Sequence, residues 1–452
     1  VHSEYVIPGW NEYVKEKRTI ARYAYNEWIQ CGKPKYGFEY EEMYKSRAQF
    51  KYAIRYCKNH DSEFRSNAYA EAIRKNDYAS FWKSVAKSNN SSANKYAINI
   101  DGCIGDDNIA ERWREYFCDL YNCHDNNASK QAFDNRLKLA LSNVKDVTLS
   151  IDDVTTTCCN LKRGKSPGPD GISSEAILFG CPSLFNHIWM LFNLFLKFSY
   201  LPDNLISSAI IPLVKNKAGN LSDLNNYRAI AISNVFSKLF EYLLIDQVYS
   251  YSDYDYFQFG FKDSHSTGLC TNVLKRTIDY YRNYGSHVFT CFVDFNKAFD
   301  SVNYWKLFSK LLDDNINCKI VSIIAYWYCK QVCFVRWDNS VSSTSSIGNG
   351  TRQGGVLSPY LFSRYIRDLI ASVVDSGVGC KVNGITVNIL AYADDIVLIS
   401  PSWRALQALI SILHDNAAAI NLSCNISKTV AMVFKPRDKR WCISSSFPNF
   451  TM

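Results

Sequence analysis

The sequence predicts an α+β protein with an α-helical N-terminal extension. Residues from about 9 to 88 repeat apolar side chains at helical spacing. Two later regions predict antiparallel strand pairs: residues 210–217 with 226–232, and the two apolar runs within 389–399. The chain has 452 residues, of which 47% are apolar and 21% charged. This composition is that of an ordinary folded protein with room for roughly two or three domains.

The N-terminal extension is basic and aromatic. The whole chain has a net charge of +8, and residues 1–100 hold 17 Lys and Arg against 11 Asp and Glu. Lys and Arg interleave there with Tyr, Phe and Trp, which favours a helical arm that binds a nucleic-acid backbone and stacks on bases. The alternative is an amphipathic helical domain whose aromatic side chains form a core and whose charges are solvated. A polar stretch at 87–92 is the predicted linker.

Cysteine usage and hydropathy argue against several classes of protein. Sixteen cysteines are scattered through a long chain without a leader peptide, which indicates reduced thiols inside a cell. Cys118, Cys123 and His124 have no second Cys/His pair at zinc spacing, so zinc is not expected. Polar residues interrupt the longest apolar stretch, 184–201, which predicts a buried helix and not a bilayer span. The start at Val1 and the abrupt end indicate a fragment.

Two adjacent carboxylates stand at the centre of residues 389–399. The apolar runs on either side predict a β-hairpin, and Asp394 and Asp395 converge only where the chain bends tightly between them. Two carboxylates held at a partly buried tip repel each other and need a cation, for which Mg²⁺ is the natural candidate. The alternative is ordinary turn chemistry on a solvated loop.

Two basic regions are candidate phosphate sites. A helix with Ser150 as its N-cap leads into the Gly/Pro-rich loop 162–171, whose backbone can approach a phosphate closely, although the same residues also form ordinary turns. Further on, Lys215 or Lys217 at the end of one predicted strand and Arg228 on its partner can face one space and neutralise a triphosphate. The alternative is surface charge beside a hairpin.

An acidic residue and a glycine-rich loop complete the candidate site. Asp294 follows the strand predicted at 288–294, a common place for a helix cap and also for a group presented to a ligand. Gly354 beside Gln353 at the entrance of a predicted helix, 360–374, allows backbone and amide to sit against a nucleotide. Downstream, the pattern predicts a helix at 406–418 and a strand at 430–434.

In their order, these stretches resemble the reverse transcriptases of non-LTR (LINE-type) retrotransposons. The resemblance covers roughly residues 148–437. Its matching motifs are Ser166-Pro-Gly-Pro-Asp-Gly171, Asn226-Tyr-Arg228, Gln258-Phe-Gly-Phe261 with His265-Ser-Thr267, Phe292-Val-Asp-Phe-Asn-Lys-Ala-Phe-Asp300, Arg352-Gln-Gly-Gly-Val-Leu-Ser-Pro359 and Ala391-Tyr-Ala-Asp-Asp395. The segment 6–10 also resembles the linker that precedes the polymerase in such elements.

The resemblance implies a right-hand polymerase fold. Fingers are expected at about 148–287 and a palm at about 288–437, after a helical basic extension at 1–130. Residues 438–452 would be the truncated start of a thumb that is mostly missing. The implied activity is RNA-directed DNA polymerisation, in which dNTPs extend a DNA primer on an RNA template. The implied location is the nucleus and cytoplasm, with no membrane partner.

The resemblance also implies roles for individual residues. Asp294, Asp394, Asp395 and Lys428 match catalytic positions. Two Mg²⁺ ions, for which Mn²⁺ can substitute, would be held by the three aspartates and the carbonyl of Phe295. The implied dNTP contacts are Lys215, Lys217, Arg228, Phe299, Gln353 and Gly354, with Phe299 as the gate against a ribose 2′-hydroxyl. The implied template or primer contacts are Lys162, Arg163, Lys165 and Tyr392.

The chain departs from the family pattern at three places. Ala229 stands where Pro is usual, and residues 262–264 replace Arg-Lys-Gly. Ser363-Arg364 stands where Asn followed by an apolar residue is common. Two alternatives therefore stay open. One is an inactive remnant that only binds RNA. The other is an RNA-dependent RNA polymerase, against which Phe299 and Ala393 both argue.

Overall fold

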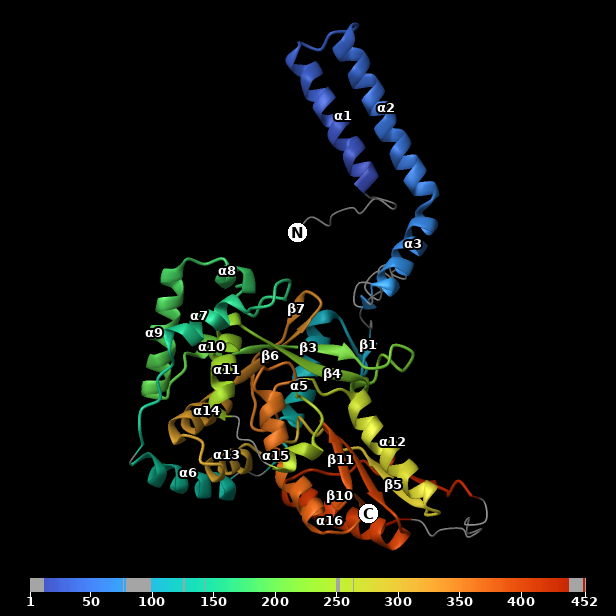
Figure 1. Cartoon of the computed structure of the whole chain (residues 1–452). Coiled ribbons are helices and arrows are strands. Elements are labelled where there is room, and N and C mark those ends of the chain that lie inside the picture. Colours follow the sequence, from blue (N-terminus) through green and yellow to red (C-terminus); the bar gives the residue numbers. More distant parts are fainter. Residues whose placement is uncertain are drawn as a thin grey trace. The chain divides into compact units, whose positions relative to one another are not determined.

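The computed structural model describes residues 12–75, 77–78, 99–124, 127–142, 144–248, 253–262, 264–438 and 450–451. The chain divides into two compact units, residues 1–95 and 96–452. Figure 1 shows the helices and strands of both. The predicted linker at 87–92 and the motif at 6–10 lie outside the described residues, as does most of the expected thumb segment 438–452.

The first unit is a pair of antiparallel helices followed by a third. These are α1 (Glu12–Gln30), α2 (Phe38–Asn59) and α3 (Asp61–Arg74). A small core joins α1 to α2, in which Val14 packs against Ala53 and Cys57. Ala53 and Cys57 are four residues apart on α2 and face Val14 of α1, so the apolar periodicity of the N-terminal region does report a helix pair.

A four-stranded antiparallel sheet is the centre of the second unit. Its strands are β5 (Val288–Val293), β11 (Ile389–Tyr392), β12 (Asp395–Ser400) and β13 (Val430–Phe434), in the order β11-β12-β5-β13. Both faces of the sheet are covered at β12 and β5, because alternate residues of these strands belong to different apolar clusters, whereas the edge strand β13 is largely exposed. One face packs on α16 (Trp403–Ala419) and the other on α12 (Thr267–Asn283). The hairpin predicted at 389–399 and the strand predicted at 430–434 are confirmed.

A second sheet is built on β3 (Ser208–Val214) and β4 (Tyr227–Ser233), which pair antiparallel over seven residues as the sequence predicts. β3 also pairs in parallel with β6 (Val332–Trp337), a strand that is not among those predicted. Short strands extend this sheet and form two small ribbons. They are β1 (Asn99–Ile100), β2 (Cys103–Ile104), β7 (Ser340–Val341), β8 (Ser345–Ser346), β9 (Cys380–Val382) and β10 (Ile385–Val387).

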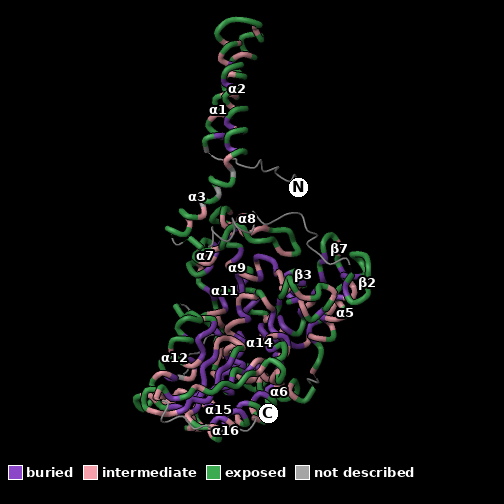
Figure 2. The backbone as a smooth tube through the Cα atoms, turned by 90° about the vertical axis from the view of Figure 1, so that its right-hand side faces the viewer, coloured by how far each residue is buried: buried purple, intermediate pink, exposed green. Residues whose placement is uncertain are grey.

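Helices surround the two sheets, and the buried residues concentrate among them (Figure 2). They are α5 (Asp106–Leu120), α6 (Asn127–Leu141), α7 (Ile151–Cys159), α8 (Ser174–Leu178), α9 (Pro182–Phe198), α10 (Asp203–Ile206), α11 (Val235–Val248), α13 (Tyr304–Asp313), α14 (Cys318–Lys330) and α15 (Ser358–Asp375). Ser150 caps α7 as predicted, because its side chain accepts a hydrogen bond from Asp153 N at 3.0 Å. None of the described helices is both long and apolar enough to cross a bilayer.

The unit boundary differs from the extension expected at 1–130. Helix α5 packs on β6 and β7, and α6 packs on α13 and α14, so both belong to the second unit. The physical reason is that Trp113 and Phe117 of α5 are fully buried in the main core of the second unit. The sequence alone does not show which core these side chains join.

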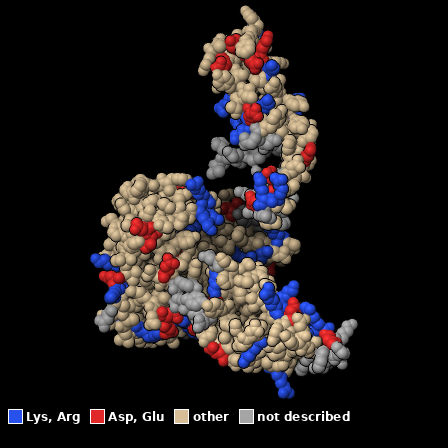
Figure 3. All heavy atoms as spheres, in the orientation of Figure 1, with Lys and Arg blue, Asp and Glu red and all other residues tan. Residues whose placement is uncertain are grey.

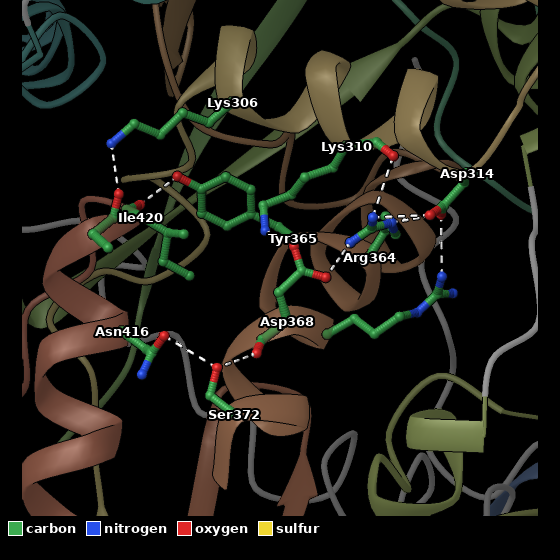
Figure 4. Close-up of polar contacts among 11 residues, drawn as sticks. Lys306, Lys310, Asp314, Arg364, Tyr365, Asp368, Ser372, Asn416 and Ile420 are labelled. Atoms are coloured by element: carbon green, nitrogen blue, oxygen red, sulfur yellow. Dashed lines mark hydrogen bonds and ion pairs between the residues drawn. The ribbon is translucent and has the colours of Figure 1, made fainter. Parts of the chain in front are cut away.

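Helix α15 is held between α13 and α16 by polar contacts (Figure 4). Arg364 donates to both oxygens of Asp314, at 2.5 and 2.8 Å, and to Asp368 at 2.9 Å. The hydroxyl of Tyr365 donates to the carbonyl of Ile420 just after α16. The departure at Arg364 therefore places a buried cation between two carboxylates that compensate its charge.

Candidate active site

The hairpin tip is a tight turn of two residues. Tyr392 pairs with Asp395, which leaves Ala393 and Asp394 between the strands. Ala393 has a φ of 57°, a left-handed conformation that costs energy for any residue with a Cβ. The turn therefore has to be stabilised by its surroundings.

The side chain of Gln258 stabilises this turn. Its Oε1 accepts from Ala393 N at 2.9 Å, and its Nε2 donates to Ala393 O at 3.1 Å. The same Oε1 accepts from Gly260 N at 2.8 Å, and Phe259 N donates to Ala391 O at 2.8 Å. The Gln-Phe-Gly-Phe motif thus fixes the backbone from which Asp394 projects. The motif is recognisable in the sequence, but its contact with the turn is not, because 135 residues separate Gln258 from Ala393.

We expect Gly260→Ala to disturb the tip. A Cβ at this position would lie 2.5 Å from Ala393 N, closer than packed atoms allow, so the turn would have to move. Thermal unfolding should show a destabilised protein, and any activity that depends on Asp394 should fall. The matched control is Gly268→Ala in α12, where the nearest atom would be Ser266 Oγ at 3.4 Å. Equal effects of the two substitutions would contradict the close packing of residue 260 against the turn.

Asp294 lies beside the hairpin although 100 positions separate it from Asp394. Ile396 pairs with Val293, and one further step in this antiparallel register brings Asp395 opposite Asp294. Asp294 Oδ2 accepts from Asn425 Nδ2 at 3.0 Å and lies 3.8 Å from Lys428 Nζ.

The three aspartates bring negative charges close together in one cluster. Burial raises the pKa of Asp394, and repulsion from Asp395 and Asp294 adds to the rise. Burial likewise raises the pKa of Asp395, with repulsion from Asp294 as the second cause. A bound cation would remove both the repulsion and part of the desolvation cost, so the chemistry of this donor set fits a hard divalent ion.

The cluster has to adjust to hold such an ion. In the described part of the chain, no three carboxylate, imidazole or thiolate groups are close enough to hold a metal as they stand. The ammonium of Lys428 lies 3.8 Å from Asp294 Oδ2, and a metal would take over this contact.

A cavity of about 760 Å³ opens beside the cluster. Asp294 and Asp394 line it, as do the side chains of several cations and the loop that carries Gln353. The cations are Lys215, Arg228, Lys297, Arg352 and Lys428. Burial lowers the pKa of Lys215, whose Nζ donates to Asn225 O at 2.9 Å. The volume and the mixture of carboxylates and cations suit a nucleoside triphosphate with its metal.

Several other residues predicted for this site also line the cavity. They are Phe295, Phe299, Gln353 and Gly354. The ring of Phe299 is stacked on Phe362 with centroids 4.1 Å apart, which fixes its orientation. Gly354 has a φ of 108°, and a Cβ there would lie 2.9 Å from Ala231 O. Glycine is therefore required for the close approach of this loop to β4.

The remaining predicted contacts do not line the cavity. Lys217 lies beyond the end of β3, and Tyr392 packs with the apolar cluster under α12. The residues expected to contact template or primer, Lys162, Arg163 and Lys165, are exposed on their loop. The guanidinium of Arg163 lies 4.8 Å from the ring centroid of Phe179. A longer polymer could reach these residues outside the cavity, but one nucleotide in it could not.

Asp300, the last residue of the motif at 292–300, is a buried carboxylate without a predicted role of its own. Its residue is 6% exposed, and burial raises its pKa to about 6. In the unfolded chain the pKa of an Asp side chain is 3.8. Between pH 4 and 6 the folded state therefore retains a proton on Asp300 that the unfolded state has lost. The free energy of unfolding therefore falls as the pH rises through this window, by about 3 kcal/mol in total.

The variant Asp300→Asn should lack this loss of stability. We expect its free energy of unfolding, measured in denaturant without metal, to exceed that of the parent increasingly as the pH rises from 4 to 6. Above pH 6 the difference should stay constant. A difference that does not change with pH would contradict the raised pKa of Asp300.

Comparisons with known proteins agree with this geometry. The family profile "Reverse transcriptase (RNA-dependent DNA polymerase)" matches residues 214–445, about half of the chain. The chain is 24% identical over 294 residues to a putative 115 kDa protein of the type-1 retrotransposable element R1DM of Drosophila melanogaster. It is 25% identical over 302 residues to the RNA-directed DNA polymerase from mobile element jockey of Drosophila funebris.

These alignments cover 64% and 63% of this chain but only 27% and 32% of the two relatives. The chain thus spans about a third or less of the length of the relatives it matches. A further relative is the Pol polyprotein of the type-2 element R2DM of Drosophila melanogaster, at 24% identity over 280 residues, which covers 61% of this chain and 26% of that protein. From the family match and the retrotransposon relatives, the chain belongs to the reverse transcriptase family.

Proposed function

We propose that the chain is the polymerase part of a non-LTR retrotransposon protein and extends a DNA primer with dNTPs on an RNA template. The observation that carries this proposal is the meeting of Asp294 with the Asp394–Asp395 tip beside a cavity lined by cations. Carboxylates that need a metal and cations that can neutralise phosphates are the two requirements of nucleotidyl transfer.

The residues fit a site for two Mg²⁺ ions, or Mn²⁺ in their place. Asp294, Asp394 and Asp395 would hold them through carboxylate oxygens, with the backbone carbonyl of Phe295 as a further ligand. When bound, such ions lower the pKa of a primer 3′-hydroxyl and neutralise the leaving pyrophosphate. Lys428 is close enough to Asp294 to hold or deliver a proton at this site.

The cavity wall provides the contacts for the nucleotide. Lys215 and Arg228 line it from the two strands of the β3–β4 pair and would bind the triphosphate. The ring of Phe299, fixed by its stacking on Phe362, would collide with a ribose 2′-hydroxyl and so favour deoxynucleotides. This selection distinguishes the proposal from an RNA-dependent RNA polymerase.

Primer extension on poly-rA with oligo-dT tests the proposal. Incorporation of dTMP that needs Mg²⁺, stops in EDTA and strongly exceeds UMP incorporation supports it. Preference for UTP would favour an RNA polymerase. RNA binding by a folded chain without any incorporation would favour an inactive remnant.

We also propose that the α1–α2 pair binds RNA. Lys15, Arg18 and Arg22 recur at i, i+3 and i+7 on α1 and are exposed. On α2, an exposed row of four cations recurs at similar spacing: Arg47, Lys51, Arg55 and Lys58. The two rows share one side of the pair, because Arg18, Arg22 and Arg47 line one hollow together with Tyr25. Exposed Lys and Arg of these helices are visible in Figure 3.

A charge-matched comparison tests this surface. The triple substitution Arg18→Gln, Arg22→Gln and Arg47→Gln should weaken RNA binding in EDTA. It should also reduce the slope of log affinity against log salt by about 2, since each lost phosphate contact on a single strand removes about 0.7. The control, Lys17→Gln with Lys33→Gln and Lys45→Gln, removes the same charge elsewhere on the unit. Equal effects of the two triples would contradict a specific surface.

A further inference from the structure

Two segments that line the cavity are joined along their backbones. Thr351 N donates to Phe299 O at 2.7 Å, and Gly350 N donates to Val302 O at 2.8 Å. The side chain of Asn349 donates to Asp300 O at 2.7 Å. These bonds fix the register between residues 299–302 and the loop that carries Gln353, so their side chains face each other in a defined way.

Gln353 is held at both ends. Its backbone carbonyl accepts from Ala231 N at 2.8 Å, which ties it to β4. Its side-chain Nε2 donates to Asp300 Oδ1 at 2.9 Å. An ionised carboxylate accepts hydrogen bonds only, so it selects one of the two orientations of the amide. The amide nitrogen is directed to Asp300, which leaves the oxygen Oε1 for another partner.

From this geometry we infer that Asp300 is a positioning residue that fixes the amide of Gln353, so that its Oε1 accepts a hydrogen bond from the incoming nucleotide. The inference rests on the proposed function, which supplies the nucleotide. Asp300, Gln353 and Asp394 line the same cavity. Asp300 itself is only 6% exposed, so little of its side chain is open to a ligand. Asp300 acts through Gln353, whose Oε1 would accept a hydrogen bond from the hydroxyl of the nucleotide sugar.

The charge on Asp300 controls this orientation. A protonated carboxyl can donate as well as accept, so either end of the Gln353 amide could then face it. Burial raises the pKa of Asp300 to about 6, against the lowering effect of Gln353, Lys297, Lys215 and Tyr121. Cys123 is a further titratable group close to Asp300. The orientation should therefore be lost as the pH falls through about 6.

A double-mutant cycle on nucleotide binding tests the inference without requiring turnover. The full chain is bound to poly-rA and an oligo-dT primer that ends in a dideoxynucleotide, with Mg²⁺, and the Kd of dTTP is measured from pH 5.5 to 8. We expect the parent Kd to rise as the pH falls through 6. Asp300→Asn should weaken binding roughly fivefold at pH 8, the effect of one hydrogen bond, and should remove most of the pH dependence.

Gln353→Met provides the second arm of the cycle. It should also weaken dTTP binding, and adding Asp300→Asn to it should have no further effect. Tyr121→Phe is the control for a general disturbance of the pocket, because it removes the 3.5 Å contact to Asp300 and leaves the bond from Gln353 in place. Since Tyr121 lowers the pKa of Asp300, this variant should move the pH dependence upward without removing it. Additive effects of the two substitutions, or a pH dependence unchanged in Asp300→Asn, would overturn the inference.

The outcome is separable from that of the proposed function. If the parent extends primers but the effects of Asp300→Asn and Gln353→Met on the Kd of dTTP are additive, only the role of Asp300 is refuted. A parent that binds dTTP with the expected dependence but never extends a primer refutes the proposed activity and leaves the positioning role standing. A parent that neither extends primers nor binds dTTP refutes both.

Discussion

Asp394→Asn should reduce primer extension by on the order of 10³-fold or more, because a metal ligand at a reacting phosphate supplies several kcal/mol of transition-state stabilisation. The same substitution should stabilise the folded protein when no metal is present. Burial and the neighbouring Asp395 and Asp294 raise the pKa of Asp394, so its ionised form costs stability at neutral pH. The neutral amide removes this cost.

Two measurements check the expected loss of activity and the expected gain of stability. Extension rates with Mg²⁺ and melting temperatures in EDTA at pH 7.5 are compared for the parent and Asp394→Asn. The control is Asp338→Asn, which changes an exposed carboxylate in a turn outside the cavity and should alter neither quantity. An Asp394→Asn protein that extends primers at the parent rate would refute the catalytic assignment of this carboxylate.

Arg352→Met should destabilise the protein by about 3–5 kcal/mol, because it leaves the carboxylate of Glu241 buried without a cation, with the hydrogen bond from Val356 N remaining. The side chains of this ion pair are 2% and 1% exposed. Arg352 also donates to Ser233 Oγ at 3.2 Å, and its guanidinium lies 4.8 Å from the ring centroid of Trp327. The pair joins α11 to the loop of Gln353, so activity should fall together with stability.

Denaturant unfolding measures the effect of breaking the pair. Removing both charges with Arg352→Met and Glu241→Gln should recover part of the lost stability, since no unpaired charge remains buried. Arg136→Met breaks an exposed pair with Asp313 and should change the unfolding free energy little. Equal effects of Arg352→Met and Arg136→Met would contradict the buried environment of Glu241.

The sequence predicts local features of this fold better than it predicts contacts between distant segments. The hairpin around Asp394, the β3–β4 pair and the Ser150 cap follow from short-range patterns, and the structure confirms them. Helix α14 is not predicted, because it is buried along most of its length and its apolar residues leave no clear helical periodicity.

The candidate site shows the same division. Asp394 and Asp395 are recognisable from their own segment, but nothing local indicates that Asp294 lies beside them, and only the family resemblance supplied that expectation. The hydrogen bonds of Gln258 to Ala393 and of Gln353 to Asp300 join segments 135 and 53 residues apart. Such partners depend on the register of the sheets and loops, which periodicity and composition do not encode.

The central claim is that Asp294 and Asp394 act as one metal-dependent site. It is tested most directly by the primer-extension rate with saturating Mg²⁺ for Asp294→Asn, Asp394→Asn and the double variant. The account predicts that each single variant loses nearly all activity and that the double variant is no worse than either, since residues that act as a unit are not additive. An Asp294→Asn protein with a rate near that of the parent would contradict it.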